Sequence, residues 1–198
     1  MYLNIRYPSF LTCLKGRFKL YLAYEDTNLM KLPLITIEDV LKAFRVRLSY
    51  QREALIRGAY AFALSAHNGQ KRKSGEDYIQ HPLYTALYLA RIGMRSKTIA
   101  AALLHDIPED TDKTLEDVEN KFGKEIAFIV NGVTKLGNLK LRDMKEEAHL
   151  ENLRKMFLAM ASDIRVVIIR LADRLHNMET LAIHTPEKKR RIAMETME

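Results

Sequence analysis

Apolar residues recur at steps of three and four along most of this 198-residue chain. One such run comprises Leu55, Ala59, Phe62, Ala63 and Ala66. This spacing gathers apolar side chains on one face of an α-helix, which must then be buried against other helices. No stretch shows the alternation of apolar and polar residues that is typical of a half-buried strand. The sequence therefore predicts an all-α fold.

Residues that favour helix ends divide the chain into segments. Thr36 and Thr114 are good N-caps, and each precedes acidic residues that complement the helix dipole. Ser96 is expected to cap another helix, and Gly123 to stop the one that begins at Thr114. The expected helices cover about residues 36–46, 55–68, 82–92, 96–104, 114–122, 126–132, 145–160, 164–178 and 185–198, with an irregular loop from about 132 to 143.

One segment allows two interpretations. Residues 166–169 are all β-branched, which favours a strand. Helical spacing nevertheless continues through them, at Ile164, Ile168, Leu171, Leu175 and Met178. A helix is therefore the preferred prediction.

The composition narrows the class of protein. Lys and Arg number 32 against 25 Asp and Glu, which gives a net charge of +7 and favours an anionic partner such as a nucleotide, nucleic acid or phosphate. Cys13 is the only cysteine, which excludes an intramolecular disulfide framework and favours a reducing, cytoplasmic location. No apolar run approaches the roughly 18 residues that a bilayer span needs, so no membrane role is expected.

Four side chains are candidate metal ligands: His81 before one helix, the adjacent His105 and Asp106 at the end of another, and Asp173 on a third. Imidazole nitrogens combined with carboxylate oxygens suit Mn²⁺, Fe²⁺ or Zn²⁺ and leave positions open for water. Adjacent residues normally diverge on a helix, but Pro108 can distort the backbone so that the pair converges. The alternative is an exposed polar pair at a helix end.

Two further carboxylates, Glu109 and Asp110, follow Asp106 closely. Carboxylates this close repel one another. A bound dication or an opposing basic loop would offset the repulsion. This context raises the expectation of a metal site.

A second polar cluster lies on a helix that is otherwise apolar on the same face. Asp173, Asn177 and Thr180 share one side of it, at steps of four and three. Buried polar groups need partners. The alternative to ligation is a salt bridge of Asp173 with Arg170 or Arg174, with Asn177 as a buried hydrogen-bonding residue.

Four sequence blocks resemble one family. They are AHNGQKRKSGEDYIQHP at residues 66–82, AALLHDIPEDT at 101–111, VTKL at 133–136 and LADRLHNM at 171–178. In order and spacing they resemble the metal-dependent HD phosphohydrolases, specifically the hydrolase domain of Rel/SpoT-type enzymes that act on the alarmones (p)ppGpp. The resemblance extends from about residue 35 to the end and implies a helical HD-domain bundle.

The resemblance implies specific roles. A single Mn²⁺ would be held by His81, His105, Asp106 and Asp173. Glu109 and Asp110 would position or deprotonate the attacking water. Substrate would be bound by Arg72, Lys73 and Ser74 on one wall and by Asn177 and Thr180 on the other. The expected reaction removes the 3′-diphosphate, giving GDP or GTP and pyrophosphate.

Three residues depart from the family's usual pattern: Asp77 replaces a usual proline, Pro108 an aliphatic residue and Arg170 a frequent lysine. None is a predicted ligand, but Asp77 could alter the rigidity and charge of the substrate loop. Two alternatives stay open. One is a stand-alone HD phosphohydrolase for another nucleotide such as NADPH, and the other is a non-catalytic module that binds a nucleotide or RNA.

The resemblance also implies a domain order. Residues 1–34 are expected to be an appendage of unknown role, residues 35–185 the hydrolase domain, and residues 186–198 the start of a connecting helix. Synthetase and regulatory domains are expected to follow in the full-length protein. The expected partner is the small guanine nucleotide, with no direct binding of nucleic acid.

Overall fold

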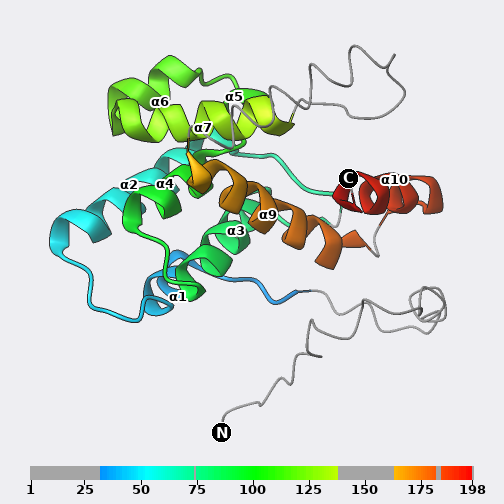
Figure 1. The fold of residues 1–198 in the computed structure, drawn as a ribbon, viewed down its shortest axis with the longest axis horizontal. Coiled ribbons are helices and arrows are strands. Elements are labelled where there is room, and N and C mark those ends of the chain that lie inside the picture. The colour runs from blue at the N-terminus through cyan, green and yellow to red at the C-terminus, as the bar shows by residue number, and fades with distance from the viewer. Residues whose placement is uncertain (1–31, 74, 138–162, 182–183, 198) are drawn as a thin grey trace, which may run out of the picture. The chain divides into compact units, whose positions relative to one another are not determined.

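The protein is described by a computed structural model that covers residues 32–73, 75–137, 163–181 and 184–197. Within these residues the regular elements are all helices (Figure 1), which confirms the all-α prediction. They are α1 (Ile37–Lys42), α2 (Tyr50–Ala66), α3 (Gln80–Arg91), α4 (Ser96–Leu104), α5 (Ile107–Asp110), α6 (Leu115–Phe122), α7 (Lys124–Gly137), α9 (Ile164–Glu179) and α10 (Pro186–Met197).

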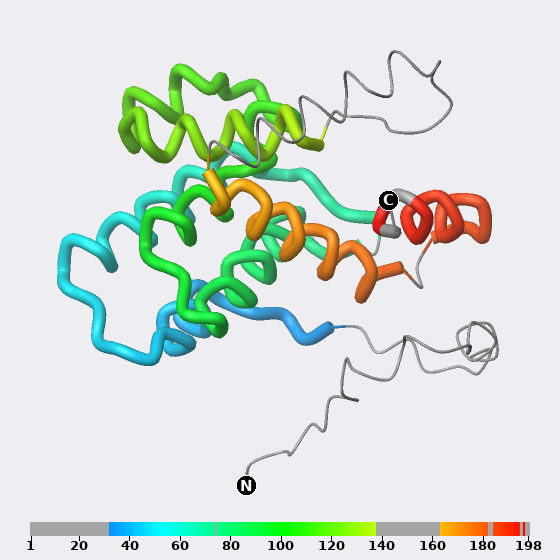
Figure 2. The backbone as a smooth tube through the Cα atoms, in the orientation of Figure 1, coloured from blue at the N-terminus to red at the C-terminus, as the bar shows by residue number. Residues whose placement is uncertain are grey.

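Helix α4 lies at the centre of the packing. It contacts α2, α3, α7 and α9, and every residue from Thr98 to Leu104 is buried. Three consecutive alanines, Ala100 to Ala102, present little side-chain bulk, which lets neighbouring helices approach closely. The tube in Figure 2 shows α2 running beside α4, and α3 beside α9. The C-terminal end of α4 therefore meets α3 and α9, the two helices that carry the other candidate ligands.

The predicted caps of two helices are confirmed. Backbone N–H groups of Thr36 and Thr114 donate to the carboxylates of Asp39 and Asp117, at 2.8 and 2.7 Å, in capping boxes. Gly123 follows α6 with a φ of 86°, a conformation that favours glycine. Residues 166–169 lie within α9, so the helical interpretation of that segment is also confirmed.

The prediction that a loop begins at about residue 132 is wrong. Helix α7 continues to Gly137. Gly132 lies inside the helix and faces α9. A Cβ atom at this position would lie only 2.6 Å from Val166 Cγ2, so a larger residue would not fit here. This glycine permits close helix packing and does not end the helix.

Other boundaries also differ. Ser96 is the first residue of α4 and is itself buried, while Arg95 takes the cap position. Helix α1 ends at Lys42, short of the predicted residue 46. The helix predicted over residues 145–160 lies outside the described residues.

The described residues form one compact unit. In the part of the chain that the structure describes, no helix combines the length and apolar character needed to cross a membrane. The domain boundaries predicted above stay predictions.

Candidate metal centre

Three helices bring the candidate ligands together. His81 lies in the first turn of α3, and His105 and Asp106 form the junction between α4 and α5. One ligand atom from each of these three residues lies within 4.8 Å of the others. The junction makes this possible, because α4 ends at Leu104 and α5 begins at Ile107, so the two adjacent residues do not share one continuous helix. Such a mixed nitrogen and oxygen cluster suits a divalent cation.

The orientation of His105 tests whether the cluster can hold a divalent cation. Its Nδ1 donates to the carbonyl oxygen of Ala102, at 2.8 Å, which leaves Nε2 to face Asp106. Nε2 is buried 3.0 Å from Asp106 Oδ1 yet has no hydrogen-bond partner among the described residues. Burial disfavours the charged imidazolium, but Asp106 outweighs it and raises the pKa of His105 to about 9. The cluster thus favours a positive charge at this position, and a bound cation would supply it.

Asp106 is correspondingly acidic. Burial alone would raise the pKa of this carboxyl group, but His105, His81 and the Tyr78 hydroxyl together hold it well below its ordinary value. The second oxygen, Oδ2, lies 3.5 Å from His81 Nε2. Asp106 is therefore ionised at neutral pH and can act as an anionic ligand.

Asp173 lies against the same cluster from α9. Its Oδ1 is 3.1 Å from His81 Nε2 and accepts a hydrogen bond from Asn177 Nδ2 at 2.7 Å. Its Oδ2 accepts from Arg170 at 2.6 Å. The contacts of the alternative interpretation, a salt bridge with Arg170 plus Asn177, are thus present alongside the contact with His81. Ligation by Asp173 stays a prediction.

The two predicted catalytic carboxylates, Glu109 and Asp110, are the exposed residues of the short helix α5. Asp110 accepts a 2.5 Å hydrogen bond from the Tyr78 hydroxyl, which also contacts Asp106 Oδ2 at 3.0 Å. Loss of hydration and the negative charge of Asp106 raise the pKa of Glu109 above its ordinary value. Both carboxylates therefore lie next to the cluster while remaining open to solvent, as groups that handle a water molecule must.

A cavity of about 330 Å³ is linked to the cluster through two lining residues, Tyr78, which donates to Asp106, and Asn177, which donates to Asp173. It is lined by Lys71, Arg72, Lys73, Tyr78, Arg174, Asn177, His184, Lys188 and Ile192. Three of the predicted substrate-binding residues, Arg72, Lys73 and Asn177, are in this lining. Thr180 is not in the lining, and its hydroxyl donates to the carbonyl oxygen of His176 at 2.9 Å. Ser74 lies outside the described residues.

The basic wall of the cavity is a loop between α2 and α3. Backbone N–H groups of Arg72 and Tyr78 donate to the carbonyl oxygens of Glu76 and Gln70, at 2.9 and 3.0 Å. Asp77, the residue expected to change this loop, forms an exposed 2.9 Å ion pair with Lys71. Figure 2 shows the loop extending from α2 towards α10, in agreement with the shared cavity.

Like charges meet in this cavity. Burial and the positive charge of Lys73 lower the pKa of Lys188. Burial, Lys188 and Lys73 likewise lower the pKa of His184. A cavity in which cations destabilise one another gains from a bound anion.

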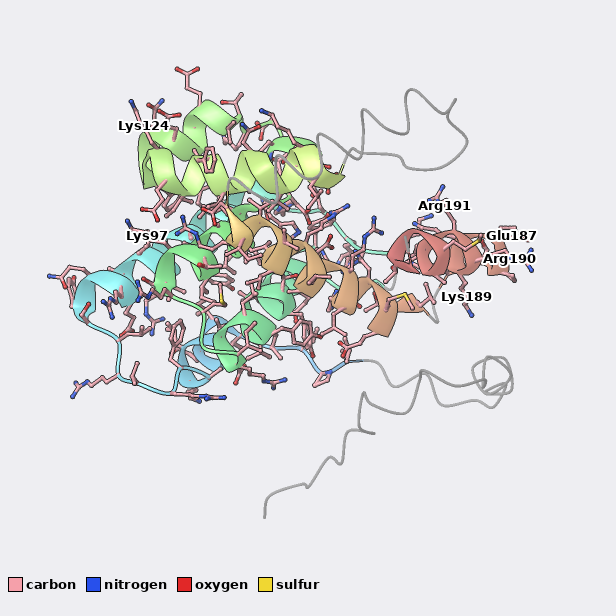
Figure 3. All side chains as sticks on the ribbon, viewed as in Figure 1. Lys97, Lys124, Glu187, Lys189, Arg190 and Arg191 are labelled. Atoms are coloured by element: carbon pink, nitrogen blue, oxygen red, sulfur yellow. The ribbon has the colours of Figure 1, made fainter. Side chains whose placement is uncertain are left out.

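Several of these residues had no role predicted from the sequence. Tyr78 lies within the motif of residues 66–82, and its signal was an aromatic residue between the basic loop and His81. His184 lies in the predicted hydrolase domain but was given no role. Lys188 was assigned to the connecting segment, although the basic run at 188–191 was a usable signal. In Figure 3, Lys189 and Arg191 project from different sides of α10, so the members of that run do not share one face.

Comparisons with known proteins agree with this geometry. The family model described as HD domain matches residues 59–198, more than half of the chain, and the chain belongs to the HD-domain family. Within that class it is 54% identical over 143 residues to the bifunctional (p)ppGpp synthase/hydrolase SpoT of Escherichia coli, covering 72% of this chain and 20% of that protein. The resemblance to Rel/SpoT-type hydrolase domains is thereby confirmed.

Two other relatives extend the comparison. A guanosine-3′,5′-bis(diphosphate) 3′-pyrophosphohydrolase of Vibrio cholerae is 55% identical over 148 residues, covering 75% of this chain and 21% of that protein. The solved structure of a metazoan orthologue of SpoT, described as hydrolysing ppGpp, matches with a TM-score of 0.56 and 26% identity, covering 72% of this chain and 83% of that one. The chain spans about a fifth of the length of these curated relatives.

Proposed function

We propose that this chain hydrolyses the 3′-diphosphate of (p)ppGpp to give GDP or GTP and pyrophosphate. The observation that carries the proposal is the cluster of His81, His105 and Asp106, whose ligand atoms lie within 4.8 Å of one another beside a basic cavity of about 330 Å³. The names of the relatives support this choice of substrate.

We further propose that the metal is Mn²⁺, held by His81, His105 and Asp106 with Asp173 as a fourth ligand. A bound divalent cation would make a coordinated water more acidic and neutralise charge on the diphosphate. The nitrogen and oxygen ligand set suits Mn²⁺, and the positive charge favoured at His105 supports a cation at this position.

The side chains around the cluster divide the remaining work. The Glu109 carboxylate accepts a proton from the attacking water. Asp110, fixed by its hydrogen bond from Tyr78, orients that water. The water oxygen bonds to the phosphorus next to the ribose, the bond from that phosphorus to O3′ breaks, and O3′ takes up a proton from solvent water.

The basic cavity binds the nucleotide. The Arg72 guanidinium and the Lys73 ammonium would lie against the guanine, ribose and phosphates, and Asn177 would close the opposite side. These contacts persist from bound substrate to transition state, so they mainly contribute to binding.

The test is pyrophosphate release from ppGpp by the purified chain, measured with and without Mn²⁺. We expect Mn²⁺-dependent release from ppGpp and little or none from NADPH or a cyclic nucleotide. The matched control is His105→Ala under the same conditions. Release from NADPH alone would favour the alternative phosphohydrolase, and absence of release from every nucleotide would contradict the proposal.

The surrounding protein is a separate proposal. Because the chain covers 20% of the Escherichia coli relative, we propose that further domains, including a synthetase, belong to the full-length protein. The cytoplasmic location and the role of residues 1–34 stay predictions.

A further inference from the structure

His176 is a buried imidazole for which no role has been given so far. It lies on α9, one turn after Asp173, and is 1% exposed. Its ring stacks on Tyr84, with centroids 4.9 Å apart, and packs against the ring of His81, also at 4.9 Å. The packing fixes the orientation of the ring, so its nitrogen atoms point in defined directions.

Two donors meet at His176 Nδ1. Arg72 Nη1 lies 3.0 Å away, and His81 Nδ1 lies 2.9 Å away. A guanidinium can only donate, so His176 Nδ1 carries no proton and is the acceptor. Two unprotonated nitrogens at 2.9 Å would repel each other, so His81 Nδ1 carries the proton and donates it to His176.

This assignment determines which nitrogen of His81 can bind a metal. With Nδ1 bonded to His176, Nε2 is the nitrogen of His81 that is left to bind a metal, and it faces Asp173 Oδ1 at 3.1 Å and Asp106 Oδ2 at 3.5 Å. Metal-binding histidines usually donate their other N–H group to an acceptor, which fixes the tautomer and the ring plane. For His81 that acceptor is another imidazole.

The network also reaches the cavity wall. Arg72 uses Nη2 to donate to Asn177 Oδ1 at 3.1 Å, and Asn177 in turn donates to Asp173 at 2.7 Å. The guanidinium of Arg72 therefore contacts partners of two candidate ligands, His81 and Asp173.

We propose that His176 is a positioning residue for the metal centre: it accepts hydrogen bonds from His81 and Arg72, and so orients His81 for ligation and links that ligand to the substrate loop. This rests on the proposed function only in assuming that the cluster binds a divalent cation.

The first test measures Mn²⁺ affinity by titration calorimetry, without substrate. His176→Phe keeps an aromatic ring next to Tyr84 but removes the acceptor, and it should weaken Mn²⁺ binding by about 10–100-fold. His176→Asn can place its amide oxygen near the position of Nδ1 and should recover most of the affinity. The control is His184→Phe, which removes an imidazole from the wall of the same cavity and should bind Mn²⁺ like the wild type.

The second test needs no variant. In ¹⁵N-labelled wild-type protein without metal, a scalar coupling across the hydrogen bond should join Nδ1 of His81 and Nδ1 of His176. A double-mutant cycle of Arg72→Met and His176→Phe adds a third readout, because residues that share one acceptor should have non-additive effects on Mn²⁺ affinity.

The outcomes separate the two proposals. Wild-type Mn²⁺ affinity in a folded His176→Phe variant, or absence of the coupling once both rings are assigned, would overturn the positioning role alone. Mn²⁺ binding without hydrolysis of ppGpp would overturn the proposed function and leave the positioning role intact. A wild-type protein that binds no Mn²⁺ would contradict both.

Discussion

The candidate metal centre and the adjoining cavity are built differently. The candidate metal centre lies where α3, the junction of α4 and α5, and α9 meet, and its His81, His105 and Asp173 side chains are all nearly inaccessible to solvent. Apart from Arg174 of α9, the cavity takes its charges from loops and from α10, where Lys71 and Lys73 are exposed and Lys188 is partly exposed. Buried groups that are bonded to one another depend on each other, so the loss of one disturbs the rest. Exposed cations each make a small, separate contribution to binding. Substitutions in the first region should therefore abolish function, and those in the second should reduce it by degrees.

The largest effects are expected for His105→Ala and Asp106→Ala. Each removes one of three clustered ligands, so Mn²⁺ binding and pyrophosphate release should both fall below detection. Calorimetry and a pyrophosphate assay check the two results separately. Full metal occupancy in either variant would exclude that residue as a ligand. It would also contradict the expectation that substitutions in the buried cluster abolish function.

Glu109→Gln should separate metal binding from catalysis. The substitution keeps the shape of the side chain and removes its charge, so Mn²⁺ should remain bound while kcat falls by about 10²-fold or more. Glu109 is exposed and lies outside the three-residue cluster, which supports a role in handling water. If the variant loses Mn²⁺, Glu109 is a ligand, and the metal centre includes this exposed residue as well as the buried cluster.

The same contrast explains what the sequence could predict. Residue type made His81, His105 and Asp106 candidate ligands, and the four sequence blocks that resemble one family placed them in one site. The structure brings these three residues together. The helical class followed from apolar spacing, and the caps at Thr36 and Thr114 from local chemistry that needs no tertiary contact.

Long-range contacts account for what the sequence did not predict. Gly132 indicated a helix end, but its small size serves the packing against Val166 of α9, which no local rule contains. His176 lies within a motif, but the sequence indicated no role for it. Its contact with Arg72, which lies 104 positions away in sequence, became visible only in the structure. Lys188 was placed in a connecting segment on the strength of the resemblance, whereas it lines the cavity together with Lys73, which lies far from it in sequence.

Lys188→Ala tests the graded behaviour expected of the cavity. Loss of one cation near a polyanionic nucleotide should raise KM several-fold with little change in kcat, because the contact persists from bound substrate to transition state. The effect should shrink at high salt, since a partly exposed charge is screened. Arg190→Ala removes an exposed charge from the same helix and serves as the matched control. A fall in kcat at unchanged KM would contradict the assignment.

The smallest effect is expected where neither region is touched. Helix α6 packs on α7, and its cap Thr114 accepts a hydrogen bond from the backbone N–H of Asp117 at 3.2 Å. Thr114→Ala should cost about 1 kcal/mol of unfolding free energy, which lowers Tm by about 2–4 °C in a chain of this size. Mn²⁺ affinity and KM should not change. A change in either would show that the two regions depend on the rest of the bundle more than their contacts indicate.

The capping carboxylates should also make the stability of the fold depend on pH. Hydrogen bonds from the backbone and side chain of Thr114 lower the pKa of Asp117 below its ordinary 3.8, and those of Thr36 do the same for Asp39. A carboxyl group whose pKa is lowered by folding contributes stability above its unfolded pKa, and this contribution is lost as the pH falls through the folded value. Asp117→Asn should therefore be less stable than the wild type at pH 7, and the difference should narrow as the pH falls below about 3.8. Thermal unfolding of the two proteins from pH 7 to pH 3 checks this, and a gap that stays constant over that range would show that the charge of Asp117 does not stabilise α6.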